Sequence, residues 1–267
     1  MAFFTRDLLV LNRKMKIVLL VIALSAALSL FFLWRYMVQQ SMGQNAAYKA
    51  PMNVYSSAEK MMIREKFDKA LKEYARSAKM LEQIPGIDLS TDFYYAIVNN
   101  AIGTVHLRIG VYGNNDRPIK LRSDLGRNQD EIRLALSYFE RSVGAYKKWL
   151  KLHRPGAEEI AALAKSRQGV AEDKIEIKPF ERYERALSVS LTNCGLAHRY
   201  LHQYDQARAY YNEALQLWPD NKTARHNLED MEKVLAEEAA AARGEPVPAG
   251  SGKEAPADGQ TEKMLDN

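Results

Sequence analysis

Residues 188–221 decide the fold of this 267-residue chain: SVSLTNCGLAHRYLHQYDQARAYYNEALQLWPDN. Their apolar members recur at steps of three and four residues, which predicts two amphipathic helices. Small residues stand where two packed helices would touch, and large residues fill the space between them. The small ones are Gly195, Ala207 and Ala214, and the large ones are Leu191, Tyr204, Tyr211 and Leu217. Because Pro219 closes the pattern, the stretch predicts a complete helical hairpin.

This spacing resembles the tetratricopeptide (TPR) repeat, a helical hairpin of about 34 residues with small, aromatic and proline residues at set positions. The match is close at Tyr204-Asp205-Gln206-Ala207, Tyr211, Ala214 and Pro219. Cys194 and His198 stand where the family has leucine and tyrosine. Since one hairpin cannot bury its apolar face alone, the resemblance implies neighbouring hairpins and a function in holding other proteins.

A looser copy of the pattern occupies about residues 51–85. Phe67-Asp68-Lys69-Ala70 aligns with Tyr204-Asp205-Gln206-Ala207, and Ala58 takes the small position of Gly195. A half-buried strand would alternate apolar and polar residues, and no stretch of the sequence does so convincingly. We therefore predict an all-α fold, with a TPR-like α-solenoid of helical hairpins over residues 51–236.

A further unit contains an insertion at about residues 111–130. Gly103 takes its small position, and the partner alanine is Ala135, 32 residues later. The corresponding residues of the first hairpin described, Gly195 and Ala207, are only 12 residues apart. A long loop between packed helices is usually functional or disordered. This one is rich in Gly, Asn, Asp and Arg, so it is either a solvated surface loop or a loop that contacts a partner.

Helix signals continue to the end of the repeat region. We expect a helix through Trp149 that ends near Pro155, a short helix over residues 158–167 and a long helix from Pro179. Asp220-Asn221 predicts the N-cap of a closing helix that runs to about Leu235. From about residue 237 the sequence changes to Ala, Gly, Pro and Glu, with seven acids and three bases. Such a segment buries too little apolar surface to order itself, so residues 237–267 are predicted to be a disordered tail.

Residues 17–34, IVLLVIALSAALSLFFLW, form an uninterrupted run of apolar or small residues. Eighteen helical residues span about 27 Å, close to the thickness of the hydrocarbon core of a bilayer. We therefore predict a transmembrane anchor over residues 17–37. A cleaved signal peptide is the alternative, with Ala23-Leu24-Ser25-Ala26 as the cleavage site, but cleavage there would leave LSLFFLW exposed on the mature protein.

Basic residues predict the orientation of this anchor. Three of them precede the apolar run and one follows it closely: Arg13, Lys14 and Lys16, then Arg35. The positive-inside rule places residues 1–16 in the cytoplasm, and the linker over residues 38–50 and the helical domain across the membrane. Within the run, the spacing of Ala23 with Ala27 and of Ser25 with Ser29 would let two such helices pack, so a homodimer through the membrane helix is one option.

The formal net charge of +5 does not indicate a nucleic-acid-binding protein. Residues 1–37 contain five basic residues and one acid, so the rest of the chain has an excess of only one positive charge. Nucleic-acid binding requires concentrated positive charge, whereas here the excess lies beside the apolar run. The single cysteine, Cys194, excludes an intramolecular disulfide, and its packing position in the repeat predicts a buried thiol.

No sequence motif predicts catalysis, a cofactor or a metal ion. There is no Gly-rich phosphate loop, no nucleophile elbow and no acidic pair in a suitable context. His198 and His202 are four residues apart, but the glutamate that a zinc peptidase helix needs is missing. His198 also takes an aromatic packing position, as His106 does in the preceding unit. Asn221-Lys222-Thr223 is a formal glycosylation sequon. We expect no catalytic residue, no cofactor and no metal site.

The TPR resemblance implies a groove, lined by the first helix of each hairpin, as the binding site for a partner protein. The corresponding residues of this chain are Asn100, Thr104, Arg108, Asn193, Leu196, Arg199, Tyr200 and Asn227. Their amide and guanidinium groups can hydrogen-bond an extended peptide or a carboxylate. An ordinary solvated helix face is the alternative for each of them.

Three classes of function are compatible with these features. The chain resembles inner-membrane-anchored TPR proteins of bacteria, which assist assembly of envelope complexes or protein quality control. That resemblance implies a single-pass membrane protein that presents an interaction module in the periplasm. A permanent structural subunit of a larger membrane-associated machine is the alternative. An enzyme on a repeat scaffold is the third class, and it would require a cleft with convergent titratable groups.

Overall fold

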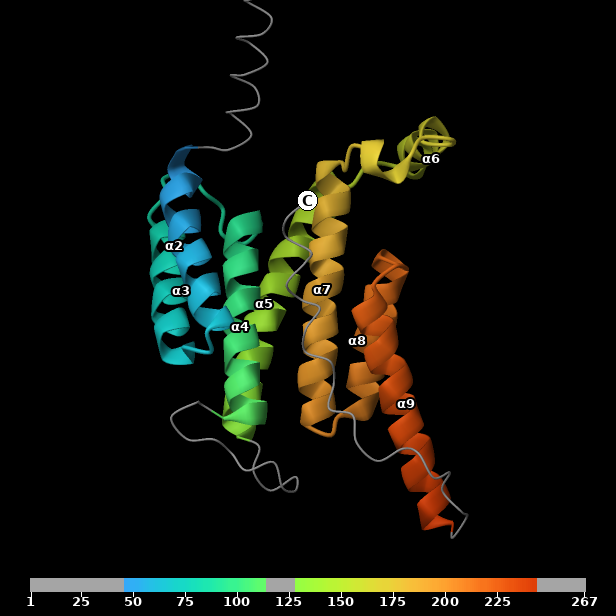
Figure 1. Ribbon diagram of the computed structural model, residues 1–267. Helices are drawn as coiled ribbons and strands as arrows, with labels where there is room; N and C mark the ends of the chain where they lie inside the picture. Colours follow the sequence, from blue (N-terminus) through green and yellow to red (C-terminus); the bar gives the residue numbers. More distant parts are fainter. Residues whose placement is uncertain (1–45, 114–127, 244–267) are drawn as a thin grey trace, which may run out of the picture. The chain divides into compact units, whose positions relative to one another are not determined.

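A computed structural model describes residues 46–113 and 128–243 of the chain (Figure 1). Within those residues it contains eight α-helices, one short 3-10 helix and no strand. The α-helices are α2 (Ala46–Ile63), α3 (Phe67–Glu82), α4 (Phe93–Tyr112), α5 (Gln129–His153), α6 (Ala157–Ser166), α7 (Pro179–Tyr200), α8 (Tyr204–Leu217) and α9 (Lys222–Ala242), and the 3-10 helix is Glu172–Lys174. The predicted all-α fold is confirmed for this part of the chain.

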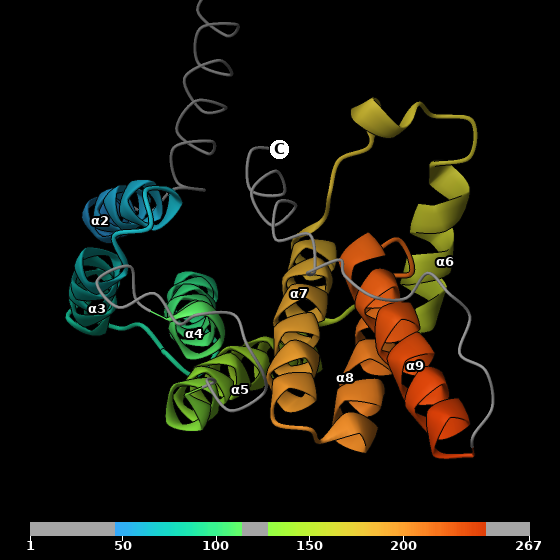
Figure 2. The same cartoon turned by 60° about the horizontal axis from the view of Figure 1, so that its bottom comes forward.

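Helices that follow one another in the sequence pack as hairpins. The chain divides into residues 1–50 and residues 51–267, and the second of these units contains the hairpins. Within it, residues 51–63 of α2 pair with α3, α4 pairs with α5 and α7 with α8, while α9 packs against α8. Figure 2 shows α7 between the α4/α5 pair and the α8/α9 pair. This series of paired helices is consistent with the predicted TPR-like solenoid.

Glycine allows the close approach of the two helices in two of these hairpins. A Cβ atom on Gly195 would lie 2.6 Å from the ring of Tyr211, and a Cβ atom on Gly103 would lie 2.6 Å from the ring of Phe139. Only glycine fits at either position without displacing the ring. The alanines predicted at the other contact positions, Ala58, Ala70, Ala135, Ala207 and Ala214, are fully buried. The predicted small-residue positions are therefore confirmed.

Buried polar side chains join α7 to the end of its hairpin. Ser188 Oγ donates to the carbonyl of Ala214 at 2.8 Å, and Asn221 Nδ2 donates to Ser188 Oγ at 2.9 Å. The Oδ1 atom of Asn221 accepts from the backbone N–H of Ala224 at 3.0 Å, which confirms the predicted N-cap of the closing helix. Because Asn221 is only 2% exposed, its side chain is not accessible as a glycosylation site in this fold.

The helix ends between the α4/α5 and α7/α8 hairpins agree with the predicted ones. Helix α5 ends at His153, α6 covers the predicted short helix, and α7 begins at Pro179. Asn128 caps α5, and α4 continues to Tyr112. The insertion is therefore narrower than the predicted residues 111–130.

Two helices extend beyond the predicted bounds of the helical domain. Helix α2 begins at Ala46, inside the segment predicted as a linker over residues 38–50. Helix α9 continues to Ala242, beyond the predicted start of the tail at residue 237. Both segments are rich in alanine, which is the strongest helix former. The alanines at residues 46, 47, 50 and 239–242 therefore favour the extension of a neighbouring helix.

Several predictions fall outside the described residues. They concern the cytoplasmic segment (1–16), the transmembrane anchor (17–37), most of the insertion (114–127) and the tail beyond residue 243. Among the residues that are described, none of the helices combines the length and the apolar character needed to cross a bilayer.

Candidate functional site

The residues predicted to line a partner-binding groove lie on three helices. Asn100, Thr104 and Arg108 belong to α4, Asn193, Leu196, Arg199 and Tyr200 belong to α7, and Asn227 belongs to α9. Helix α7 contacts both α4 and α9. The first helix of the α4/α5 hairpin is therefore next to the first helix of the α7/α8 hairpin, and α9 takes that place at the end of the series.

Two asparagines connect α4 to α7. The side-chain amide of Asn193 donates to Asn100 Oδ1 at 3.0 Å, across 93 residues of sequence. Thr104 Oγ1 donates to the backbone carbonyl of Asn100 at 2.9 Å. An asparagine side chain has two donor hydrogens and an oxygen that can accept twice, so one mutual bond uses only part of either amide. Both amides are half-buried and held in position.

An ion pair connects α7 to α9. Arg199 Nη2 lies 2.6 Å from Asp230 Oδ2, and the two side chains are 18% and 37% exposed. Arg199 is therefore already paired, and a carboxylate of a partner would have to share the guanidinium with Asp230 or displace it. Asp230 is not among the predicted groove residues. It is 31 positions from Arg199, and no sequence pattern indicates that the two residues pair.

Two of the predicted residues are nearly inaccessible. Tyr200 is 9% exposed and Asn227 is 5% exposed, so each packs between helices. Leu196 and Arg108 are half-buried. Arg108 lies close enough to Tyr74 to oppose the rise in the pKa of that phenol, which burial and the neighbouring Glu59 carboxylate cause. The accessible part of the predicted set is therefore Asn100, Thr104, Arg108, Asn193, Leu196 and Arg199.

The histidines at the aromatic positions of the repeats are packing residues, as predicted. His198 is 9% exposed and stacks on Tyr210, with ring centroids 5.1 Å apart. His106 stacks on Tyr138 in the same way at 5.6 Å. His202 lies beyond the end of α7 with φ of 58°, so it does not share a helical face with His198. Nowhere in residues 46–113 and 128–243 do three His, Cys, Asp or Glu side chains come close enough to hold a metal ion.

The sole cysteine is buried, as its place in the repeat predicts. Cys194 faces the interior of the hairpin core, and burial raises the pKa of its thiol well above the usual value. A thiol in this state is a poor nucleophile.

The two ends of the insertion lie next to each other. The backbone N–H of Asn128 donates to the carbonyl of Gly110 at 2.9 Å. His106 Nδ1 lies 2.7 Å from Glu131 Oε2, which adds a second link between α4 and the first turn of α5. The inserted residues therefore leave and re-enter the hairpin at one place.

Comparison with protein families identifies the hairpin of α7 and α8 as a known repeat. Residues 188–221 match the model of the tetratricopeptide repeat. The chain contains a TPR repeat. No match was found among the curated proteins. The matched residues run from the first buried serine of α7, Ser188, through the N-cap of α9, Asn221.

TPR repeats are generally interaction modules without enzymatic activity, and the family match points to no catalytic function. The shared face of α4, α7 and α9 is the part of the described structure that corresponds to the predicted groove. Its chemistry consists of amides, one hydroxyl and two guanidinium groups, one of which is paired with a carboxylate. Such groups donate hydrogen bonds and bind peptide carbonyls or carboxylates.

Proposed function

We propose that the protein is a membrane-anchored TPR interaction module, which binds partner proteins in the assembly or quality control of an envelope complex. The TPR repeat at residues 188–221 supports the interaction function. The apolar run at residues 17–34 and the basic residues before it support an anchor in a bacterial inner membrane, with the helical domain in the periplasm. An anchor would raise the effective concentration of the module near membrane partners.

The observation that carries the interaction function is the polar surface shared by α4, α7 and α9. The Asn100–Asn193 hydrogen bond connects side chains of α4 and α7, and the Arg199–Asp230 ion pair connects side chains of α7 and α9. Preorganised donors lose little conformational entropy when they bind an extended peptide. This favours the groove as the partner site over a solvated helix face.

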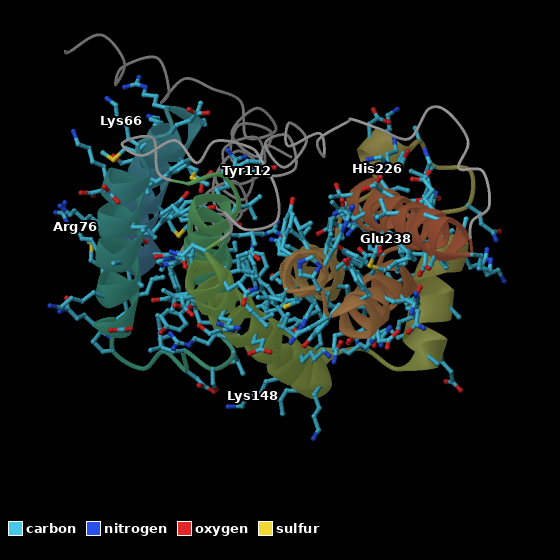
Figure 3. All side chains as sticks on the ribbon, turned by 90° about the horizontal axis from the view of Figure 1, so that it is seen from below. Lys66, Arg76, Tyr112, Lys148, His226 and Glu238 are labelled. Carbon is cyan, nitrogen blue, oxygen red and sulfur yellow. The ribbon has the colours of Figure 1, made fainter. Side chains whose placement is uncertain are left out.

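Photo-crosslinking in cells would test the groove. A photoreactive amino acid would replace Leu196 or Arg108 in separate variants of the full chain. Control variants would carry it at Arg76 on α3 or at Lys148 on α5, both of which are exposed (Figure 3). We expect discrete adducts from the groove positions and none from the controls. Adducts of equal yield from both sets would contradict a groove-specific function.

The same crosslinks distinguish an adaptor from a permanent subunit. If the partner exchanges, dilution and incubation before irradiation will abolish the adducts of the Leu196 variant. If the chain is a structural subunit, the adducts will persist and the complex will elute at one fixed size in mild detergent.

A reporter fused after Asn267 would test the orientation. We expect activity from a reporter that works only in the periplasm. Activity from a reporter that works only in the cytoplasm would overturn the proposed location of the helical domain.

A further inference from the structure

The connection between α5 and α7 departs from the hairpin pattern. It spans residues 154–178 and contains α6, a helix with no fully buried residue. Arg167 fixes it to the start of α7: its guanidinium pairs with Glu181 and donates to the carbonyl of Glu176 at 2.8 Å. Glu181 also accepts from the backbone N–H of Lys178 at 2.8 Å. The connection is therefore held in one position.

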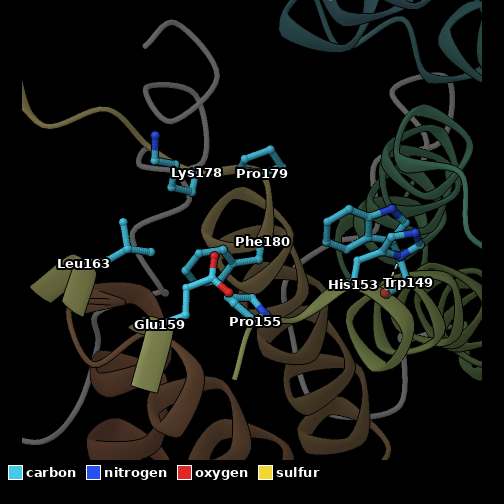
Figure 4. Close-up of a pocket in the computed structure, with 8 residues that line it drawn as sticks. All are labelled: Trp149, His153, Pro155, Glu159, Leu163, Lys178, Pro179 and Phe180. Carbon is cyan, nitrogen blue, oxygen red and sulfur yellow. Dashed lines mark hydrogen bonds between the residues drawn. The ribbon is translucent and has the colours of Figure 1, made fainter. Parts of the chain in front are cut away.

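This connection forms one wall of a trough of about 420 Å³. The trough is lined by Trp149, His153, Pro155, Glu159, Leu163, Lys178, Pro179 and Phe180. Figure 4 shows Leu163 and Glu159 on one side, Trp149 and His153 on the other, and Phe180 between them. The aromatic wall is rigid, because the Trp149 ring stacks on Tyr183 at 3.7 Å and on His153 at 4.6 Å between centroids.

Exposed apolar side chains gather around the same connection. Six large apolar side chains are exposed within residues 46–113 and 128–243, and three of them lie in residues 152–177. They are Leu152, Val170 and Ile177, which are 65%, 43% and 37% exposed. None of the three lines the trough, but all lie within residues 149–180, the segment that contributes its lining residues. An apolar trough on such a segment is the kind of surface that another apolar segment can cover.

We propose that the trough binds residues 263–266 of the same chain, Lys-Met-Leu-Asp. Apart from alanine and proline, the only apolar residues in 244–267 are Val247, Met264 and Leu265. Met264 and Leu265 are adjacent, so they can enter one trough together and cover its apolar lining.

The charges beside this pair complement those of the trough. Lys263 precedes the apolar pair and Asp266 follows it, while the trough has Glu159 and Lys178 at its rim. Lys178 Nζ lies 2.6 Å from Glu176 Oε2, and the Glu176 side chain is 81% exposed. An exposed pair of this kind is weak, so Asp266 can replace Glu176 as the partner of Lys178 at little cost.

The tail is long enough to reach the trough. Helices α7, α8 and α9 run in alternating directions (Figure 1). The end of α9 is therefore about one helix length from the start of α7. Its 21 residues make that length about 30 Å. From Arg243 to Met264 the chain has 21 residues. Fully extended they span about 70 Å, and as a flexible coil about 25 Å on average. Intramolecular docking is therefore accessible without strain in the chain.

Disulfide trapping in the full-length protein would test this docking. With Cys194 replaced by alanine, Glu159→Cys is combined with Leu265→Cys under mild oxidation. The matched control combines Leu265→Cys with Lys165→Cys, which is exposed on the same helix but does not line the trough. We expect a monomeric disulfide in about tenfold higher yield for the Glu159 variant, because docking raises the local concentration of the segment. Equal yields, or a disulfide formed only between two molecules, would overturn the proposal.

Trp149 offers a second readout that needs no crosslink. With Trp34 and Trp218 replaced by phenylalanine, Trp149 is the only tryptophan of the chain. The double change Met264→Asp and Leu265→Asp should raise quenching of Trp149 by acrylamide about twofold, since the indole loses its apolar cover. Val247→Asp, which adds the same kind of charge elsewhere in the tail, should leave quenching unchanged. Unchanged quenching in the double variant, or protection that appears only when another protein is added, would reject the tail as the occupant.

Discussion

The α4/α5 and α7/α8 hairpins are built on the same contacts, yet only the second matches the TPR family. Each places a glycine against an aromatic ring, Gly103 against Phe139 and Gly195 against Tyr211. Each also stacks a histidine on a tyrosine at the same relative position. The helices are joined differently: residues 201–203 connect α7 to α8, whereas residues 113–128 connect α4 to α5.

The comparison shows that a hairpin can form without the sequence spacing by which a family model recognises it. The contacts between the helices depend on side-chain size at a few positions, and these survive the insertion. Recognition of a repeat depends on the spacing between those positions, which the insertion changes. The α4/α5 hairpin is therefore TPR-like in its packing although residues 188–221 alone match the family.

Removal of the aromatic rings should have the largest effect and should be similar in the two hairpins. Phe139 and Tyr211 are both fully buried. Because each change leaves a large cavity, Phe139→Ala and Tyr211→Ala should each lower the free energy of unfolding by about 3–5 kcal/mol. Urea unfolding of the full chain in detergent, followed by circular dichroism, measures this. Leu134→Ala, at a position that is 41% exposed on α5, is the control and should cost less than about 1 kcal/mol. If only Phe139→Ala had a small effect on the free energy of unfolding, the two hairpins would not depend on equivalent contacts.

Addition of a single methyl group at the glycines should have a smaller effect of the same kind. Gly103→Ala and Gly195→Ala should each destabilise the protein by about 1–3 kcal/mol, since the rings they face are tightly packed. Gly144 on α5 is the control, because a Cβ atom added there would meet no neighbouring atom within 4 Å. Gly144→Ala should therefore stabilise by about 0.5–1 kcal/mol, because glycine is a poor helix former. If Gly103→Ala also stabilised, the close approach of α4 and α5 would not depend on glycine.

The sequence predicts the contacts within hairpins better than the contacts between them. Gly103 and Ala135 could be identified across the insertion because small residues are recognisable wherever helices touch. Asn193–Asn100 and Arg199–Asp230 could not, because they are 93 and 31 residues apart and involve ordinary polar residues. Their pairing depends on how one hairpin sits against the next.

The trough and the helix ends were missed for other reasons. The lining of the trough comes from α5, α6 and the start of α7, so its residues are adjacent only after folding. The start of α2 at Ala46 was missed because residues 39–49 are polar and lack strong periodicity. The end of α9 at Ala242 was missed because alanine-rich sequence fits both a tail and a helix. Composition alone does not decide between them.

Shortening the insertion should have a modest stabilising effect and make the two hairpins more alike. Replacement of residues 114–127 by two residues would reduce the connection from 16 residues to four. Asn128 already donates to Gly110 at 2.9 Å, so the ends need not move. Two halvings of loop length should stabilise the protein by about 1 kcal/mol, because less chain entropy is lost on folding. Thermal or urea unfolding measures this change.

The outcome also decides between the two interpretations of the insertion. A variant that is stable but no longer yields the adducts of the Leu196 photo-crosslinker would show that the insertion contacts the partner. Unchanged adducts would leave it as a solvated surface loop. A loss of stability greater than about 1 kcal/mol would contradict the view that the hairpin is complete without the inserted residues.

The smallest expected effect concerns the one atom by which Tyr211 differs from Phe139. Tyr211 is buried, and its hydroxyl has no hydrogen-bond partner among the described residues; burial also raises the pKa of this phenol. Tyr211→Phe should therefore change the free energy of unfolding by less than about 0.5 kcal/mol, or stabilise slightly, since no bond is lost. Tyr74 of the first hairpin is the matched control, because its hydroxyl donates to Glu59. Tyr74→Phe should cost about 1 kcal/mol. If Tyr211→Phe cost as much as Tyr74→Phe, the hydroxyl of Tyr211 would have a stabilising role that the α4/α5 hairpin lacks, and the two hairpins would differ in their packing as well as in their connections.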